Sequence, residues 1–441
     1  MFQLHDKTRF RICLAGFAVL CVLPTLLVGG WCLSRHLPGY ARAEAEQLGR
    51  QLGMTVRLDG LKHVRPGVML YEGLELGDPE TGQTVLRCRL LEIAQESADG
   101  EQGQTRTVLR ITAAQPEVEA ASLHRVWQCL QRTMEGSYGK LDADVRLAAA
   151  EVTLRAGDGS QTMTNVEGAI ETLPGGTRAE VHFRLAGVDT PEPIGIRIVR
   201  NRQVSPPASG FELYTGGGEL PCNVLAMGLE ELKPLGPRCC FRGYIWANET
   251  ADGWEGEVTG QLVNLDLGRL VTDHFPHKLT GNGQLTIQSA RFRHGRLEEG
   301  SAIVAAGPGT IDRSLLAAAI DRLSLVAGKE PPPGGDCIAY EELSLCATFD
   351  AHGLRLCGRC NAAKPGTILS DGRDCLLGEP SQPQPVAALV QTLVPQSAVQ
   401  VPASRQTDWL LRHLPVPEVM PPPGTEAIPP QARLRLKDPL R

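Results

Sequence analysis

The segment Leu343–Gly358, LSLCATFDAHGLRLCG, shows the pattern that decides the fold. Leucine, alanine and phenylalanine alternate with serine, cysteine and threonine up to Phe349, and the alternation resumes at Leu354 after a turn that contains Gly353. Successive side chains of a β-strand point to opposite faces of a sheet, so a period of two predicts a half-buried strand. The segment therefore predicts a strand, a turn and a returning strand.

Units of the same kind recur along the chain, but without the fixed period of a propeller or solenoid. They begin near Val56, Val68, Thr84, Glu151 and Gly281. The chain also holds 48 glycines and 32 prolines, which punctuate these short alternations as turn residues do. We therefore expect a mainly β fold in which adjacent strands run antiparallel.

Apolar residues at helical spacing predict a few short helices between the strands. These helices cover residues 122–134, 225–232, 311–323 and 386–393, and a helical stalk is expected at 34–53.

One uncharged apolar stretch, Ile12 to Leu33, lies near the N-terminus. A helix rises about 1.5 Å per residue, so roughly 20 such residues cross a hydrocarbon core of about 30 Å. The stretch predicts one transmembrane helix, which Pro24 can kink. The alternative is a cleaved secretory signal, but the apolar core of such a signal usually has about 7–15 residues, and this stretch is longer.

The charges that flank this stretch predict its orientation. Lys7, Arg9 and Arg11 precede it closely, whereas the basic residues that follow it stand among glutamates. Basic residues favour the cytoplasmic side of a membrane. The sequence therefore predicts a short cytoplasmic N-terminus, residues 1–11, and an exported body.

With 441 residues, the chain is too long for one compact core of ordinary size. Several domains or one elongated sheet are expected, with boundaries at the proline- and glycine-rich stretches 205–210 and 331–335. The predicted β-rich regions are 54–204, 211–330 and 337–414, and they are followed by a proline-rich tail at 415–441.

The composition excludes some classes of function. Hydrophobic residues make up 42% and charged residues 21%, as in folded proteins. The formal net charge of -6 is spread along the chain without a cluster of arginine and lysine. Nucleic acid is therefore not expected as a partner.

Cys357 and Cys360 form a CxxC motif, which can be a disulfide or thiol pair, half of a zinc site, or a redox centre. A structural zinc ion needs four ligands, and the nearest other cysteines stand at unsuitable spacings. A redox motif would open a helix, whereas this segment is typical of a strand that runs into a turn. A disulfide or free thiols is the preferred interpretation.

No motif of a catalytic, cofactor or metal site is evident. His274 and His277 flank a proline without the glutamate that a metalloprotease helix would require, so we expect both at the surface. Gly216 to Gly218 are not followed by the lysine of a phosphate-binding loop, and no Gly-x-Ser-x-Gly motif occurs. We therefore expect a protein that is not an enzyme and needs no cofactor.

Two runs in the first part of the chain resemble the opening of AsmA-like and TamB-like envelope proteins. The residues that carry the resemblance are Leu52, Gly53, Val56, Leu58, Asp59, Gly60 and Leu61, then Leu70, Leu74, Leu76, Asp78, Pro79, Thr81 and Gly82. The resemblance implies a long, twisted, groove-like antiparallel sheet with an apolar interior. It also implies an anchor in the inner membrane of a two-membrane bacterium and a role in phospholipid movement or outer-membrane assembly.

The resulting expectation is a single-pass inner-membrane protein with a periplasmic body. Such a protein would hold or transfer phospholipid along an apolar groove, with membrane lipid and other envelope proteins as its partners. The alternative is a membrane-tethered scaffold that binds proteins and carries no lipid. A third possibility is a membrane-bound enzyme whose site is assembled only by folding.

Overall fold

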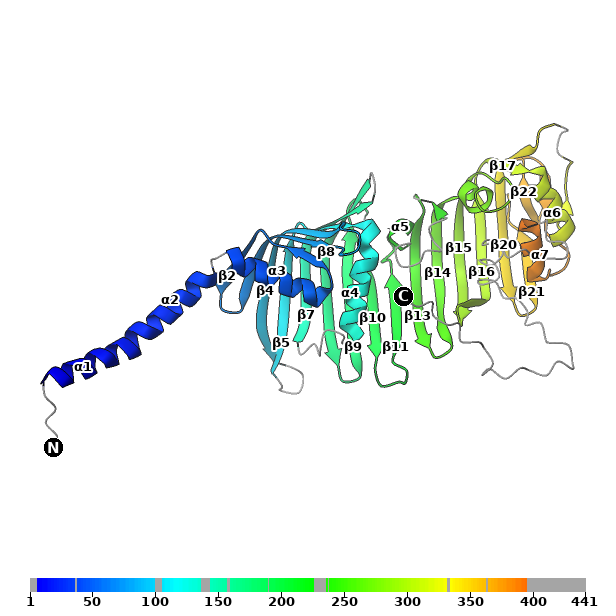
Figure 1. Ribbon diagram of the computed structural model, residues 1–441. Coiled ribbons are helices and arrows are strands. Elements are labelled where there is room, and N and C mark those ends of the chain that lie inside the picture. The colour runs from blue at the N-terminus through cyan, green and yellow to red at the C-terminus, as the bar shows by residue number, and fades with distance from the viewer. Residues whose placement is uncertain are drawn as a thin grey trace, which may run out of the picture.

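The computed structural model describes residues 6–35, 38–99, 105–135, 143–156, 159–188, 190–225, 235–236, 238–330, 334–361 and 364–394. Most of them lie in strands, and one 21-stranded sheet dominates. Figure 1 shows these strands side by side along the long axis of the molecule. The prediction of a mainly β fold is confirmed.

The first half of the sheet begins with β1 and β2, which both pair with β3. β3 pairs with β4 on its other side. β5 and β6 each pair with β4 on one side and with β7 on the other. β8, β9, β10 and β11 then follow β7 in this order. The strands are β1 Thr55–Arg57, β2 Gly60–Arg65, β3 Val68–Gly77, β4 Thr84–Asp99, β5 Thr105–Ala114, β6 Glu117–Glu119, β7 Ala143–Ala156, β8 Gly159–Leu173, β9 Gly176–Leu185, β10 Ile194–Asn201 and β11 Ala208–Tyr214.

In the second half, β11 pairs with β13, and β14, β15, β16 and β20 follow in this order. The far side of β20 pairs with both β21 and β22. β22 then pairs with β23, and β23 pairs with β18. The short β12 pairs with the start of β13, and β17 pairs with β19 in a separate sheet. The strands are β12 Leu220–Pro221, β13 Cys240–Thr250, β14 Gly253–Asp266, β15 Asn282–Arg293, β16 Arg296–Ala306, β17 Gly309–Asp312, β18 Val326–Ala327, β19 Cys337–Tyr340, β20 Glu342–Asp350, β21 Gly353–Gly358, β22 Thr367–Ser370 and β23 Cys375–Gly378.

The expected antiparallel sheet needs one correction. β7 runs parallel to β5 and β6, whereas every other pairing within the described part of the sheet is antiparallel. The chain reaches β7 from β6 through the helix α4, Leu123–Glu135. A helical crossover returns the chain to the same end of the sheet, so the next strand is parallel to the one that precedes the helix.

The helices agree in part with the predicted ranges. α3 is Pro38–Leu52, α5 is Cys222–Leu225, α6 is Arg313–Leu323 and α7 is Val386–Leu393, with one short turn of helix at Ala120–Ser122 (η2) and another at Gly268–Thr272 (η4). α6 starts later than predicted because β17 takes the preceding residues and Asp312 caps the helix, accepting a hydrogen bond from the Leu315 amide. The helix predicted at 225–232 falls almost wholly outside the described residues, as does the tail at 415–441.

The segment predicted as one membrane-spanning α-helix, Ile12 to Leu33, is instead divided. It comprises most of α1 (Asp6–Phe17), a π-helical turn η1 (Ala18–Val22) and most of α2 (Leu23–Arg35). The turn ends two residues before Pro24, which lacks an amide hydrogen and whose ring crowds the preceding helical turn. Taken singly, none of the described helices combines the length and the apolar character that a membrane crossing requires.

The proline- and glycine-rich stretch 205–210 lies between two strands that pair with each other. It joins β10 to β11, and these strands pair from Gly195–Tyr214 to Asn201–Ala208. One buried apolar cluster runs from Leu74 in β3 to Ala388 in α7. The described strands thus share a continuous core across this predicted boundary.

Candidate functional site

Apolar side chains lie opposite one another on successive strands and form one row across the sheet. Directly paired residues of neighbouring strands carry their side chains on the same face. Ile196 of β10, for example, lies opposite Val181 of β9 and Leu213 of β11. Followed from β3 to β21, this apolar row consists of Met69, Ile93, Ile111, Leu147, Gly168, Val181, Ile196, Leu213, Ile245, Val258, Ala290, Gly300, Phe349 and Leu354.

Two shorter rows flank the apolar row on the same face. One runs from β5 to β15 and the other from β13 to β21. Their members are Leu109, Val145, Ile170, Ala179, Ile198, Phe211, Ala247, Gly256 and Phe292 in the first, and Phe241, Leu262, Leu285, Val304, Leu345 and Gly358 in the second. Together the three rows make one apolar face.

The apolar row is only partly covered by the rest of the chain. Leu213 is fully buried, whereas Leu147 exposes 37% of its surface, and most other members are half-buried. Apolar area that stays in contact with water is a source of binding energy, because its removal gains about 25 cal/mol per Å². The half-buried members of the row therefore offer apolar surface that is in contact with water.

The opposite face of the same strands is charged. Arg197, which follows Ile196 on β10, lies 3.3 Å from Glu180 of β9 and 3.0 Å from Glu212 of β11. Because successive side chains alternate between the two faces, this ladder of ion pairs lies behind the apolar row. Exposed ion pairs of this kind add little stability, about 0.2–1 kcal/mol each, but they keep that face in water.

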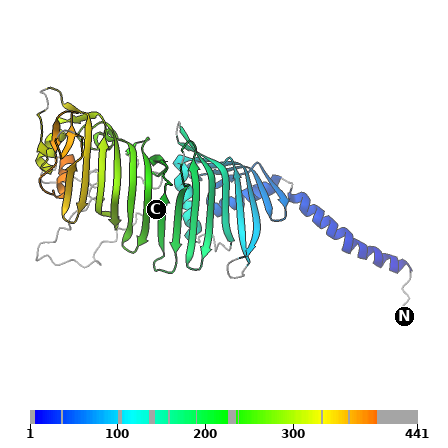
Figure 2. The same ribbon diagram turned by 180° about the vertical axis from the view of Figure 1, so that it is seen from behind.

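Helix α4 lies on the apolar face over part of the row. Met134 exposes 3% of its surface and packs against Ala179 and Ile198. The Trp127 and Phe211 rings meet edge to face, with centroids 6.4 Å apart. Figure 1 shows α4 in front of the strands, and Figure 2 shows the strands in front of the helix. The helix covers the apolar face here, and α3 covers it at β3, where the Tyr71 hydroxyl donates to Glu44 at 3.3 Å.

Acid is expected to release the N-terminal end of α4, which Arg125 holds to Asp78 at 3.2 Å. Hydrogen bonds from the Glu80 amide and the Thr81 hydroxyl, together with Arg125, lower the pKa of Asp78. The carboxylate therefore adds stability above its unfolded pKa of about 3.9, and this contribution is lost as the pH falls through the lower folded value. Fluorescence of Trp127 during acid titration measures the release.

The matched variant for this titration is Asp78→Asn, which keeps the side-chain shape but cannot titrate. We expect the acid step in the Trp127 signal to be absent from it, with a Trp127→Phe chain identifying that signal among the other tryptophans. An identical acid step in the wild-type and Asp78→Asn proteins would contradict this assignment.

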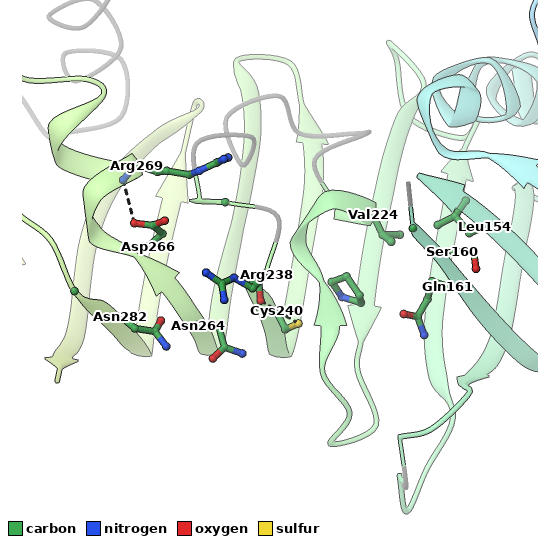
Figure 3. A pocket seen from close by; sticks show the side chains of 14 residues that line it. Leu154, Ser160, Gln161, Val224, Arg238, Cys240, Asn264, Asp266, Arg269 and Asn282 are labelled. Carbon is green, nitrogen blue, oxygen red and sulfur yellow. Dashed lines mark hydrogen bonds between the residues drawn. The ribbon is translucent and has the colours of Figure 1, made fainter. Parts of the chain in front are cut away.

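A cavity of about 990 Å³ lies at the strand ends between β8 and β15. Figure 3 shows its mixed lining, which includes Gln161, Asn264 and the exposed Arg238. Asp266 accepts hydrogen bonds from the first two backbone amides of η4, Gly268 at 3.0 Å and Arg269 at 3.3 Å. The described lining residues include no histidine and no second carboxylate, so they form no general acid–base pair.

The two cysteines of the CxxC motif have different neighbours, and the structure has no bond between their sulfurs. Cys357 on β21 lies opposite Cys346 of β20, whereas the Cys360 sulfur lies 3.0 Å from the carbonyl oxygen of Ile368. Burial raises the pKa of Cys360 to about 11. A thiol with a raised pKa is a poor nucleophile at neutral pH, which disfavours redox catalysis. A disulfide between Cys357 and Cys360 stays a prediction.

The expected surface position of His277 is wrong, because this side chain is 2% exposed. Its Nε2 lies 3.0 Å from the Thr392 carbonyl oxygen and its Nδ1 lies 2.7 Å from Ser314 Oγ. Since a carbonyl only accepts, Nε2 donates to Thr392, and the Ser314 hydroxyl that contacts Nδ1 donates in turn to Asp312 Oδ1 at 3.0 Å. The histidine joins α6 and α7 to the loop after η4, a role that the local sequence does not reveal.

No cluster of three or more histidine, cysteine, aspartate or glutamate side chains suited to a metal ion occurs among the residues that the structure describes. Comparison with known proteins matches the chain to no family model and to no curated protein. The likeness to AsmA-like and TamB-like proteins thus stays a resemblance, and the function is argued from the apolar face.

Proposed function

We propose that this chain is a non-enzymatic, membrane-anchored envelope protein that holds or transfers phospholipid along the apolar face of its sheet. The apolar row from β3 to β21 carries the proposal. An acyl chain that lies along the row removes its own methylene groups from water, and each one gains about 0.8 kcal/mol. The headgroup stays in water at the edge of the face.

The N-terminal helical segment supports the anchor. α1, η1 and α2 follow one another without an intervening residue, and Leu20 and Leu26 expose 76% and 67% of their surfaces. The Thr25 hydroxyl donates to the Cys21 carbonyl oxygen at 2.7 Å. Membrane helices use such bonds to satisfy backbone groups beside a proline, here Pro24. In this proposal the segment crosses the inner membrane and the body is periplasmic.

Photo-crosslinking tests the lipid proposal. A benzophenone amino acid is placed at Ile245, in the apolar row, or at Trp246, the next residue on β13, and the full chain is irradiated in cells of a two-membrane bacterium. The two side chains point to opposite faces of the sheet. Figure 1 shows β13 well away from α1 and α2, so lipid around the anchor does not reach either position.

We expect a phospholipid adduct at Ile245 and none at Trp246, measured by mass spectrometry of the purified chain. Equal adducts at both positions would indicate non-specific contact with lipid. Protein adducts at Trp246, without lipid at Ile245, would favour the alternative of a membrane-tethered scaffold.

A further inference from the structure

Two buried cysteines lie next to each other where β12 meets β13. Pro221 of β12 pairs with Cys240 of β13; Cys222 follows Pro221 as the first residue of α5, and Cys239 directly precedes Cys240. The Cys222 amide donates to the Cys239 carbonyl oxygen at 2.8 Å. The two sulfur atoms are 3.0 Å apart, and the two residues expose 1% and 0% of their surfaces.

We propose that Cys222 and Cys239 form a disulfide when the body folds outside the cytoplasm, an inference that rests on the exported location in the proposed function. The backbone hydrogen bond between the two residues and the 3.0 Å between their sulfurs place them within reach of a disulfide, whose S–S bond is about 2.05 Å long. A small rotation of the two side chains then brings the sulfurs into bonding distance. Oxidising compartments preserve such bonds.

The reaction is a thiol–disulfide exchange with a disulfide-bearing thiol oxidase of that compartment. The Cys239 thiolate attacks the oxidase disulfide, which breaks, and a mixed disulfide forms. The Cys222 thiolate then attacks the Cys239 sulfur, and the oxidase leaves as a dithiol that has gained both protons and both electrons. Because the thiols react before they are buried, either cysteine can make the first attack, and the balance of atoms and electrons is the same.

The position of the bond gives it a structural role. The bond would join the first residue of α5 to the residue that precedes β13, beside the pairing of β12 with β13. Cross-linking residues that are 17 apart in sequence restricts the unfolded chain. Because both sulfurs are buried, the bond must form during folding and then resist reductants until the protein unfolds.

The test uses the full chain in a two-membrane bacterium. Free thiols are alkylated at the moment of acid lysis, and a non-reducing digest is analysed by mass spectrometry. We expect a linked peptide pair that contains Cys222 and Cys239. We also expect reduction under denaturing conditions, followed by refolding with the reductant present, to lower the unfolding midpoint by about 5 °C. The Cys240→Ser variant, altered at the adjacent thiol, should keep both the link and this shift, whereas Cys239→Ser should lose both.

A second arm separates the two proposals. The purified chain is unfolded and refolded in a glutathione redox buffer, and its disulfides are mapped in the same way. A link that forms in the buffer but is missing from cells would overturn the exported location on which the inference rests. Free Cys222 and Cys239 in both arms would overturn the disulfide alone, because phospholipid crosslinking at Ile245 does not depend on it.

Discussion

Aspartate in place of Ile245 is expected to reduce phospholipid crosslinking at Phe349 by at least about tenfold, while crosslinking at Ile93 stays unchanged. The three residues belong to the same apolar row, with Ile93 on β4, Ile245 on β13 and Phe349 on β20. Figure 1 shows β4 toward the N-terminal helices and β20 at the far end of the sheet. Lipid that enters from the anchor must therefore pass β13 before it reaches Phe349.

The size of the effect follows from the cost of a charge beside hydrocarbon. An unpaired carboxylate that is taken out of water costs several kcal/mol, and about 1.4 kcal/mol already corresponds to a factor of ten in occupancy. Ile245 is half-buried, so the carboxylate can stay hydrated when no lipid is present and the sheet can still fold. The penalty appears only when an acyl chain covers it.

The matched control is Tyr244→Asp, at the preceding residue of β13. Tyr244 exposes 37% of its surface and points to the charged face, so its replacement should leave crosslinking at Phe349 unchanged. Circular dichroism and the unfolding midpoint show whether each variant is folded. Equal crosslinking at Phe349 in both variants would mean that lipid does not travel along this row.

The strands themselves could be predicted because their signal is local. The alternation of Leu343, Leu345, Ala347 and Phe349 places four apolar side chains on one face, and the structure has β20 over Glu342–Asp350. The apolar row could not be predicted, because it depends on the register of every neighbouring strand. Gly300 meets Phe349, for instance, only because β16 pairs with β20 across an intervening stretch of chain.

The features that sequence analysis missed depend on contacts between distant segments. The helix at α4 was expected, but nothing in its own residues shows that it returns the chain parallel to β5 and β6. The helical segment at Ile12 to Leu33 runs without a break, and its π-helical turn lies just before Pro24, the residue at which the sequence indicates a kink. Pro276 indicates a loop and therefore favours a surface position for its neighbour His277, but a loop can still be covered by helices, as α6 and α7 cover this one.

Phenylalanine in place of His277 is expected to lower the free energy of unfolding by about 3 kcal/mol, measured by urea denaturation. The side chain bonds to Ser314, 37 residues away, and to the Thr392 carbonyl oxygen, 115 residues away. Phenylalanine fills a similar volume but offers no polar atom. The variant therefore loses two hydrogen bonds, at about 0.5–1.5 kcal/mol each, and leaves a buried carbonyl oxygen unsatisfied at about 1–3 kcal/mol.

A matched change at His274, three residues earlier in the same loop, separates this effect from a general effect of losing a histidine. His274 is half-buried and its Nδ1 lies 2.9 Å from the Arg269 carbonyl oxygen, so His274→Phe should cost about 1 kcal/mol or less. Hydrogen exchange should show α7 opening more often in His277→Phe and not in His274→Phe, because only His277 bonds to Thr392. If both variants lost the same stability and left exchange in α7 unchanged, His277 would not be the group that holds α7 to this loop.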